Sequence, residues 1–65
     1  NVLLEMEVAA NNGNAMAQFN LGWINARGLV SSEGLMQDMD VAKVWFEKSA
    51  KLGFKDAVEV LQNNF

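Results

Sequence analysis

Residues 12–28 read Asn-Gly-Asn-Ala-Met-Ala-Gln-Phe-Asn-Leu-Gly-Trp-Ile-Asn-Ala-Arg-Gly, and this stretch decides the fold. Ala17, Leu21 and Ile24 recur at i, i+4 and i+7, which places them on one face of a helix turned toward a core. Asn14 can cap the free N–H groups of the first turn, and Gly28 can adopt the left-handed conformation that ends helices. The stretch therefore predicts an amphipathic helix between these two capping residues.

Gly22 lies inside this predicted helix. A glycine at an interior helical position costs about 1 kcal/mol relative to alanine, so its presence usually marks the close approach of another backbone. Ala15 and Ala17 on the same helix are also small. Together these residues predict a helix against which a neighbouring segment packs closely.

A second stripe on the same helix consists of Met16, Asn20, Trp23 and Arg27, spaced at i, i+4, i+7 and i+11. Tryptophan, methionine and arginine are enriched in protein–protein interfaces. This stripe is the predicted partner-binding surface, and the partner is expected to be a protein or a peptide. For Trp23, packing within the chain is an equally supported interpretation.

Further helices flank this one. Residues 2–11 predict a helix on an apolar stripe of Leu3, Met6 and Ala10, and Gly13 is suited to the turn that follows. Residues 29–37 have no sustained periodicity and are predicted to form a connecting loop.

The second half of the chain predicts two more helices. Asp38 is the predicted cap of a third helix, which ends before the next glycine. A short fourth helix is predicted from Phe54 to Leu61 or Gln62, and residues 63–65 are expected to fray. The sequence thus predicts an all-α chain of about four helices.

The composition fits one small folded domain. The chain has 65 residues, of which 51% are hydrophobic and 20% charged, and it contains neither cysteine nor proline. Its net charge of −3 and its scattered basic residues argue against a nucleic-acid partner. No apolar run approaches the roughly 20 residues that a bilayer span needs, so membrane insertion is not expected.

The chain offers little catalytic chemistry. Histidine, cysteine and tyrosine are absent, which removes the commonest general bases, nucleophile partners and soft metal ligands. Asp38 and Asp40 have the spacing of part of a hard-metal loop, but the glycine and distal glutamate of such loops are missing, so helix capping is the preferred interpretation. The glycine-rich phosphate-binding motifs are also absent. We expect no enzymatic activity, metal or cofactor.

An internal repeat is visible when the chain is compared with itself. Ala10, Gly13, Ala17 and Leu21 are followed 40 residues later by Ala50, Gly53, Ala57 and Leu61. A period of this length made of two helices is typical of an α-solenoid, in which each helix pair buries its apolar face by stacking on the next pair.

The wider pattern around this repeat consists of Gly13-Asn14-Ala15-Met16-Ala17-Gln18-Phe19-Asn20-Leu21-Gly22, then Gly28, then Glu33-Gly34-Leu35-Met36-Gln37-Asp38, then Ala42-x-x-Trp45-Phe46-x-Lys48-Ser49-Ala50-x-x-Gly53. In these motifs the chain resembles a Sel1-like repeat, a relative of the tetratricopeptide repeat. The resemblance implies an all-α helical-repeat solenoid whose helices form antiparallel pairs.

The resemblance also implies an internal organisation for a single domain covering residues 1–65. Residues 1–12 correspond to the second helix of a preceding repeat, residues 14–53 to one complete repeat, and residues 54–65 to the start of a following repeat or a C-terminal cap. The residues expected to pack within and between repeats are Ala17, Leu21, Gly22, Ala42, Trp45, Phe46, Ala50, Ala57 and Leu61.

The chain departs from the family pattern at three places. Asn25 stands where the family usually has an aromatic residue, which is expected to weaken a core contact. Met36 stands where the family usually has proline, and about four extra residues lie around Leu29 to Ser32. The last two departures predict an altered connection between the helices of the complete repeat.

Repeats of this family act as adaptors in protein complexes, often in bacterial signalling, secretion or envelope stress. The resemblance therefore implies a non-catalytic protein-interaction or scaffold module. A structural role is the alternative, in which the chain caps a longer array or forms a homo-oligomer through a stacking face. A third possibility is an accessory or regulator of an enzyme whose chemistry lies on another chain.

Overall fold

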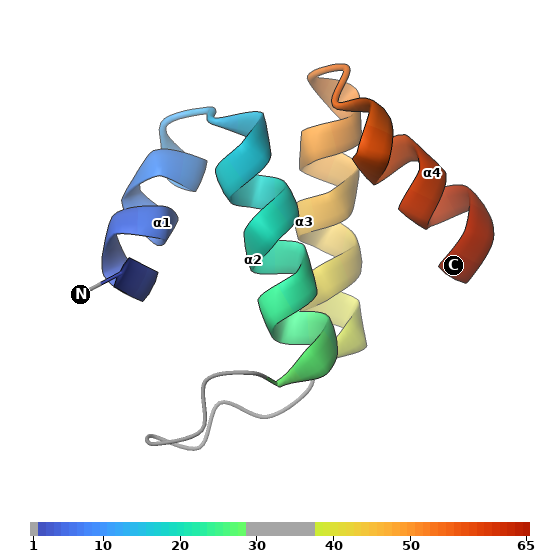
Figure 1. Cartoon of the computed structure of the whole chain (residues 1–65), viewed down its shortest axis with the longest axis horizontal. Coiled ribbons are helices and arrows are strands. Elements are labelled where there is room, and N and C mark those ends of the chain that lie inside the picture. The colour runs from blue at the N-terminus through green and yellow to red at the C-terminus, as the bar shows by residue number, and fades with distance from the viewer. Residues whose placement is uncertain (1, 29–37) are drawn as a thin grey trace.

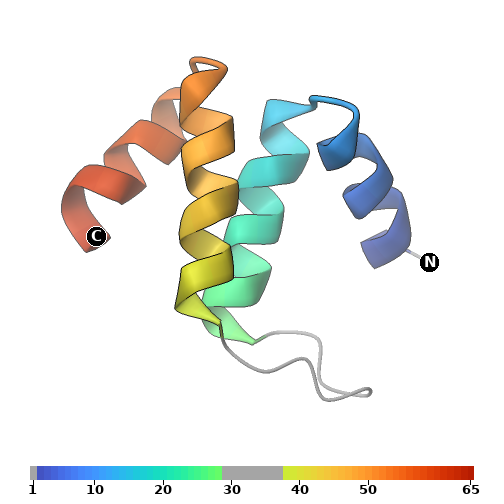
Figure 2. The same cartoon turned by 180° about the vertical axis from the view of Figure 1, so that it is seen from behind.

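The computed structural model describes residues 2–28 and 38–65, which form four α-helices and no strand. They are α1 (Val2–Asn11), α2 (Ala15–Arg27), α3 (Met39–Lys51) and α4 (Lys55–Asn64). This result confirms the predicted all-α class. The α1–α2 and α3–α4 turns lie at the same end of the molecule, and α1 and α4 lie on opposite sides of the central α2–α3 pair (Figures 1 and 2).

Each helix packs mainly on its neighbours in the chain, α1 on α2, α2 on α3 and α3 on α4. The α2–α3 pair is the centre of this arrangement, and the outer helices lean against it from either side (Figure 1).

The ends of α2 and α3 follow from local capping chemistry. The side chain of Asn14 accepts a hydrogen bond from the N–H of Ala17 at 3.0 Å, and that of Asp38 accepts one from the N–H of Val41 at 3.1 Å. Gly28 is left-handed with φ of 63° and donates to a carbonyl of the last helical turn. These contacts confirm the predicted caps, because short polar side chains and glycine satisfy backbone groups that a helix end leaves free.

The last helix is longer than predicted. It continues to Asn64, beyond the expected end at Leu61 or Gln62, so the prediction of a frayed segment over residues 63–65 is wrong for Asn63 and Asn64. The physical reason is tertiary: the ring of Phe65 lies 5.9 Å from the ring of Phe46 and holds this end against α3.

The two tight turns have the same hydrogen bonding. In each turn the N–H of the residue after the glycine donates to a carbonyl five residues earlier, from Asn14 to Ala9 at 3.0 Å and from Phe54 to Ser49 at 3.2 Å. The glycine of each turn has a positive φ, 94° in the first turn and 89° in the second. The two turns are thus related by the same 40-residue shift as the sequence repeat.

The buried residues form two clusters. The first lies between α1 and α2 around Ala10, Ala17 and Leu21, with Trp45 of α3 packed against it. The second lies between α2 and α3 around Ala26, Ala42 and Phe46. Side chains from α2 and α4 pack around the second cluster, namely Phe19, Trp23, Val60 and Leu61.

Gly22 is buried at the contact between α2 and α3, but its neighbour differs from the prediction. A Cβ at this position would lie 2.6 Å from the Cε1 atom of Phe46 and 2.9 Å from Cζ, well inside contact distance. The prediction of a backbone approach is therefore corrected: the group that requires glycine here is an aromatic ring. Phe46 itself is fully buried, so the ring fills the space that a side chain on α2 would otherwise occupy.

Two buried polar side chains join the helices. The Nε2 of Gln18 donates to the carbonyl of Ala10 at 3.0 Å and links α2 to α1. The hydroxyl of Ser49 donates to the carbonyl of Ala15 at 2.7 Å and links α3 to α2. The Gln18 nitrogen and the Ser49 hydroxyl thus have partners, whereas the buried Oε1 of Gln18 accepts no hydrogen bond from the described residues. An unpaired buried polar group costs roughly 1–3 kcal/mol.

Candidate protein-interaction surface

The four residues of the predicted surface lie on one side of α2. Met16 is 59% exposed, Asn20 and Arg27 are also exposed, and Trp23 is half-buried. We call this set, Met16, Asn20, Trp23 and Arg27, the Trp23 surface. Three of its members therefore face solvent, and Trp23 is partly covered by the rest of the chain.

The indole of Trp23 is held by neighbouring rings. Its centroid lies 5.4 Å from that of Phe46 at an interplanar angle of 76°, and 6.3 Å from that of Phe19 at 89°. Edge-to-face contacts of this kind are favourable for aromatic quadrupoles. Packing within the chain, one of the two interpretations of Trp23, is thus observed, and contact with a partner stays a prediction.

Arg27 lies over the same indole. The Cζ atom of its guanidinium is 4.6 Å from the Trp23 ring centroid, within the range of a cation–π contact. No carboxylate in the described parts of the chain forms an ion pair with Arg27. The ring therefore orients the guanidinium of Arg27, whose side chain is exposed.

A series of further rings extends from Trp23 toward α4. The ring centroids of Phe19 and Phe54 lie 5.1 Å apart, and those of Phe46 and Phe65 lie 5.9 Å apart. Phe65 is 42% exposed. Sequence reasoning did not include Phe54 or Phe65 in this region. The available signal was only that both are aromatic residues at the two ends of the last helix.

The predicted packing residues are found in the interior to different degrees. The buried members are Ala17, Leu21, Gly22, Ala42, Phe46 and Ala57. Half-buried members are Trp45, Ala50 and Leu61. The adjacent aromatics of α3 belong to different clusters, because Trp45 packs against the α1–α2 cluster and Phe46 lies in the α2–α3 cluster.

Asn25 joins the end of α2 to the beginning of α3. Its side-chain Nδ2 donates to the backbone carbonyl of Leu21 at 2.9 Å. The backbone carbonyl of Asn25 accepts a hydrogen bond from the N–H of Asp38 at 2.8 Å. Asn25 thus makes polar contacts with the backbone at both of these helix ends. The other two departures, Met36 and the extra residues from Leu29 to Ser32, lie outside the described residues.

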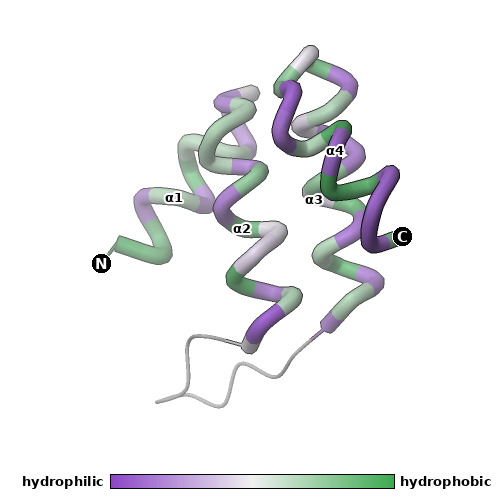
Figure 3. The backbone as a smooth tube through the Cα atoms, turned by 45° about the vertical axis from the view of Figure 1, so that its right-hand side comes forward, coloured by the Kyte–Doolittle hydropathy of each residue, from purple (hydrophilic) through white to green (hydrophobic). Residues whose placement is uncertain are grey.

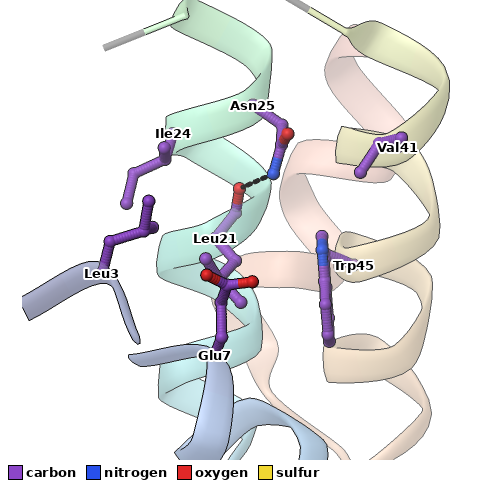
Figure 4. A pocket seen from close by; sticks show the side chains of 7 residues that line it. All are labelled: Leu3, Glu7, Leu21, Ile24, Asn25, Val41 and Trp45. Carbon is purple, nitrogen blue, oxygen red and sulfur yellow. Dashed lines mark hydrogen bonds between the residues drawn. The ribbon is translucent and has the colours of Figure 1, made fainter. Parts of the chain in front are cut away.

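Two hollows lie away from the Trp23 surface. A cavity of about 170 Å³ lies between α1, α2 and α3 (Figure 4). A wider groove of about 590 Å³ lies between α3 and α4. The cavity is lined by Leu3, Glu7, Leu21, Ile24, Asn25, Val41 and Trp45.

Among the described residues, no three side chains of histidine, cysteine, aspartate or glutamate come together in a way that could hold a metal ion. None of the helices in residues 2–28 and 38–65 is long and apolar enough to cross a membrane. Comparison of the chain with protein-family models, with curated proteins and with solved structures finds no match. The resemblance to Sel1-like repeats therefore rests on the motifs of the chain itself.

Proposed function

We propose that this chain is a non-catalytic protein-interaction module of the Sel1-like helical-repeat type, which binds a protein or peptide through the Trp23 surface. The observation that carries the proposal is the contact between the half-buried Trp23 and the exposed Arg27 on α2. Tryptophan and arginine are the residue types most enriched among the residues that dominate binding energy in interfaces.

The packing of Trp23 supports this role energetically. The rings of Phe19 and Phe46 pack against the indole and restrict its rotamers. Trp23 therefore loses little side-chain entropy when a partner covers it. Arg27 supplies donors that match a carboxylate. The preferred partner therefore combines an apolar group with an acidic one.

The arrangement of the helices supports the repeat assignment. Each helix packs mainly on its neighbours in the chain, and the two tight turns share one hydrogen-bonding pattern 40 residues apart. Both features are expected of an α-solenoid, in which every unit contacts only the adjacent units.

Substitutions on the Trp23 surface test the proposal. Partners retained by the full protein are first identified by affinity purification, and their affinities are then measured for purified variants. We expect Arg27→Ala to weaken binding about ten-fold and Trp23→Ala to weaken it by more than about thirty-fold, because interface residues of these types contribute roughly 1.4–2 kcal/mol or more. Lys43→Ala, an exposed change on α3, serves as the control.

Circular dichroism of each variant separates lost binding from lost folding, which matters most for the half-buried Trp23. Undiminished affinity in folded Arg27→Ala and Trp23→Ala variants would show that the partner binds elsewhere.

The surface of α4 favours a second candidate function, the capping of a repeat array. Phe19 and Trp23 of α2 pack toward α3, whereas the residues 40 positions later on α4 are Glu59 and Asn63, both exposed. Hydrophilic segments recur along α4 in Figure 3. A polar outer face is what a terminal repeat requires, since no further helix covers it.

The mass of the chain in solution distinguishes these structural roles. The polar face of α4 predicts that no self-association occurs there. The exposed apolar residues of α1, including Val2 at 73% and Val8 at 53% exposure, provide the alternative contact. We expect a monomer by light scattering. A dimer dissociated by Val8→Glu but not by Lys55→Glu would instead support homo-oligomerisation through α1.

A further inference from the structure

The cavity between α1, α2 and α3 has the size of one side chain. Its volume is about 170 Å³, and an engineered protein cavity of roughly 150 Å³ holds a benzene molecule. Figure 4 shows Leu3 and Glu7 on the α1 side, Ile24 on α2 and Val41 on α3 opposite. The walls are thus mostly aliphatic, and three helices contribute to them.

The polar groups of this cavity are mainly hydrogen-bond acceptors. Glu7 supplies an exposed carboxylate, and no lysine or arginine of the described residues forms an ion pair with it. The side-chain nitrogen of Asn25 donates to the carbonyl of Leu21 at 2.9 Å, and its side-chain oxygen can only accept hydrogen bonds. Glu7 is the one ionisable residue in the described lining, so the cavity complements a positive charge.

The indole of Trp45 is already in contact with a cation of the chain itself. The Nζ of Lys48 lies 4.7 Å from the Trp45 ring centroid, so this ring contributes apolar wall area rather than a further cation site. Lys48 itself does not line the cavity. Trp45 does line it, so the same ring is also part of the cavity wall.

We propose that this cavity binds the side chain of a lysine or arginine in a partner polypeptide. The aliphatic stem lies between Leu3, Ile24 and Val41, and the charged head reaches the carboxylate of Glu7. Long basic side chains bury their stems on apolar surface while the charge stays at a polar rim, which is the distribution found here. This site goes beyond the Trp23 surface and does not depend on it.

The groove between α3 and α4 provides a comparison within the same chain. It contains Glu47 and Leu61, which stand 40 residues after Glu7 and Leu21 of the cavity. Lys48 and Lys51 also line this second groove. Their charges oppose a basic side chain, so the two hollows differ in net charge although each contains a glutamate at the corresponding position.

Binding is tested on the full chain with capped pentapeptides that have four alanines and one central residue. The central residue is lysine, arginine, norleucine or glutamate, and the indole N–H signal of Trp45 is followed by NMR titration. We expect saturable binding of the lysine and arginine peptides with roughly millimolar affinity, as suits contact through one side chain. The norleucine peptide, which has the stem without the charge, is expected to bind at least about three-fold more weakly.

Three variants assign the contact to Glu7. Glu7→Gln is expected to weaken lysine-peptide binding by about three-fold or more, and Glu7→Lys to abolish it and favour the glutamate peptide. Glu47→Gln, the change at the corresponding position of the second groove, should leave the affinity unchanged. Glu7 and Glu47 are both exposed, so these variants keep the folded core.

Equal affinities for the lysine and norleucine peptides, or an unaltered affinity in Glu7→Gln, would overturn the inference, as would the absence of a saturable shift. The result is independent of the proposed partner surface, because Arg27→Ala should bind the lysine peptide as the unmodified chain does. A negative result for lysine binding in the cavity would therefore not contradict partner binding at the Trp23 surface. A negative result at the Trp23 surface would likewise not contradict lysine binding in the cavity.

Discussion

Replacing Phe46 with alanine is expected to reduce the free energy of unfolding to only about 0–2 kcal/mol. Phe46 is fully buried, and its ring contacts those of Phe19, Trp23 and Phe65. Removal of a buried phenylalanine side chain typically costs about 3–5 kcal/mol, while a domain of this size has a total stability of only about 5 kcal/mol. The change thus removes most of the free energy of unfolding.

Val44→Ala is the matched control for this prediction. Val44 lies on the same helix, two residues before Phe46, but it is 47% exposed, and its truncation should change stability by less than about 0.5 kcal/mol. Urea denaturation followed by circular dichroism measures both variants. A Phe46→Ala chain with the same midpoint as Val44→Ala would show that α2 and α3 do not depend on this ring.

Substituting Gly22 with alanine is expected to lower the free energy of unfolding by about 1–2 kcal/mol, although helix propensity alone predicts a gain of about 1 kcal/mol. The reason is the 2.6 Å separation between a Cβ at this position and the Phe46 ring. Phe46 is enclosed on all sides by the core, so the ring cannot move aside without displacing its neighbours.

Two further variants isolate the steric cause. Asn20→Ala, on the exposed side of the same helix, should be neutral or slightly stabilising. In the double variant Gly22→Ala/Phe46→Leu the smaller side chain frees space, so the combined loss should be less than the sum of the single losses. Strict additivity, measured by urea denaturation, would contradict the proposed clash.

The sequence predicted those parts of the fold that depend on local interactions. The caps at Asn14 and Asp38 and the left-handed glycine at the end of α2 are confirmed, because a cap bonds to backbone groups only a few residues away. The predicted end of α4 at Leu61 or Gln62 is too early. The observed end depends on a contact between Phe65 and Phe46, two residues that are distant in the chain.

The sites were less predictable because they combine residues from several helices. Helical spacing located the stripe from Met16 to Arg27 on one face, but only the structure shows the guanidinium of Arg27 over the indole of Trp23. The Glu7 cavity has no signature in the sequence, since its lining comes from three helices. Periodicity within one helix carries no information on such neighbours.

The uneven burial along the chain has a consequence for its motions. Five buried residues lie on α2 and three on α3, but α1 and α4 have one each, Ala10 and Ala57. Outer helices with so few buried groups open by local unfolding at a lower free energy than the centre does. The cavity is complete only while α1 is docked, whereas the Trp23 surface is built on α2 over α3. The cavity is therefore formed in a smaller fraction of molecules than the Trp23 surface. A ligand of the cavity would stabilise the docked position of α1 and so slow amide hydrogen exchange in this helix.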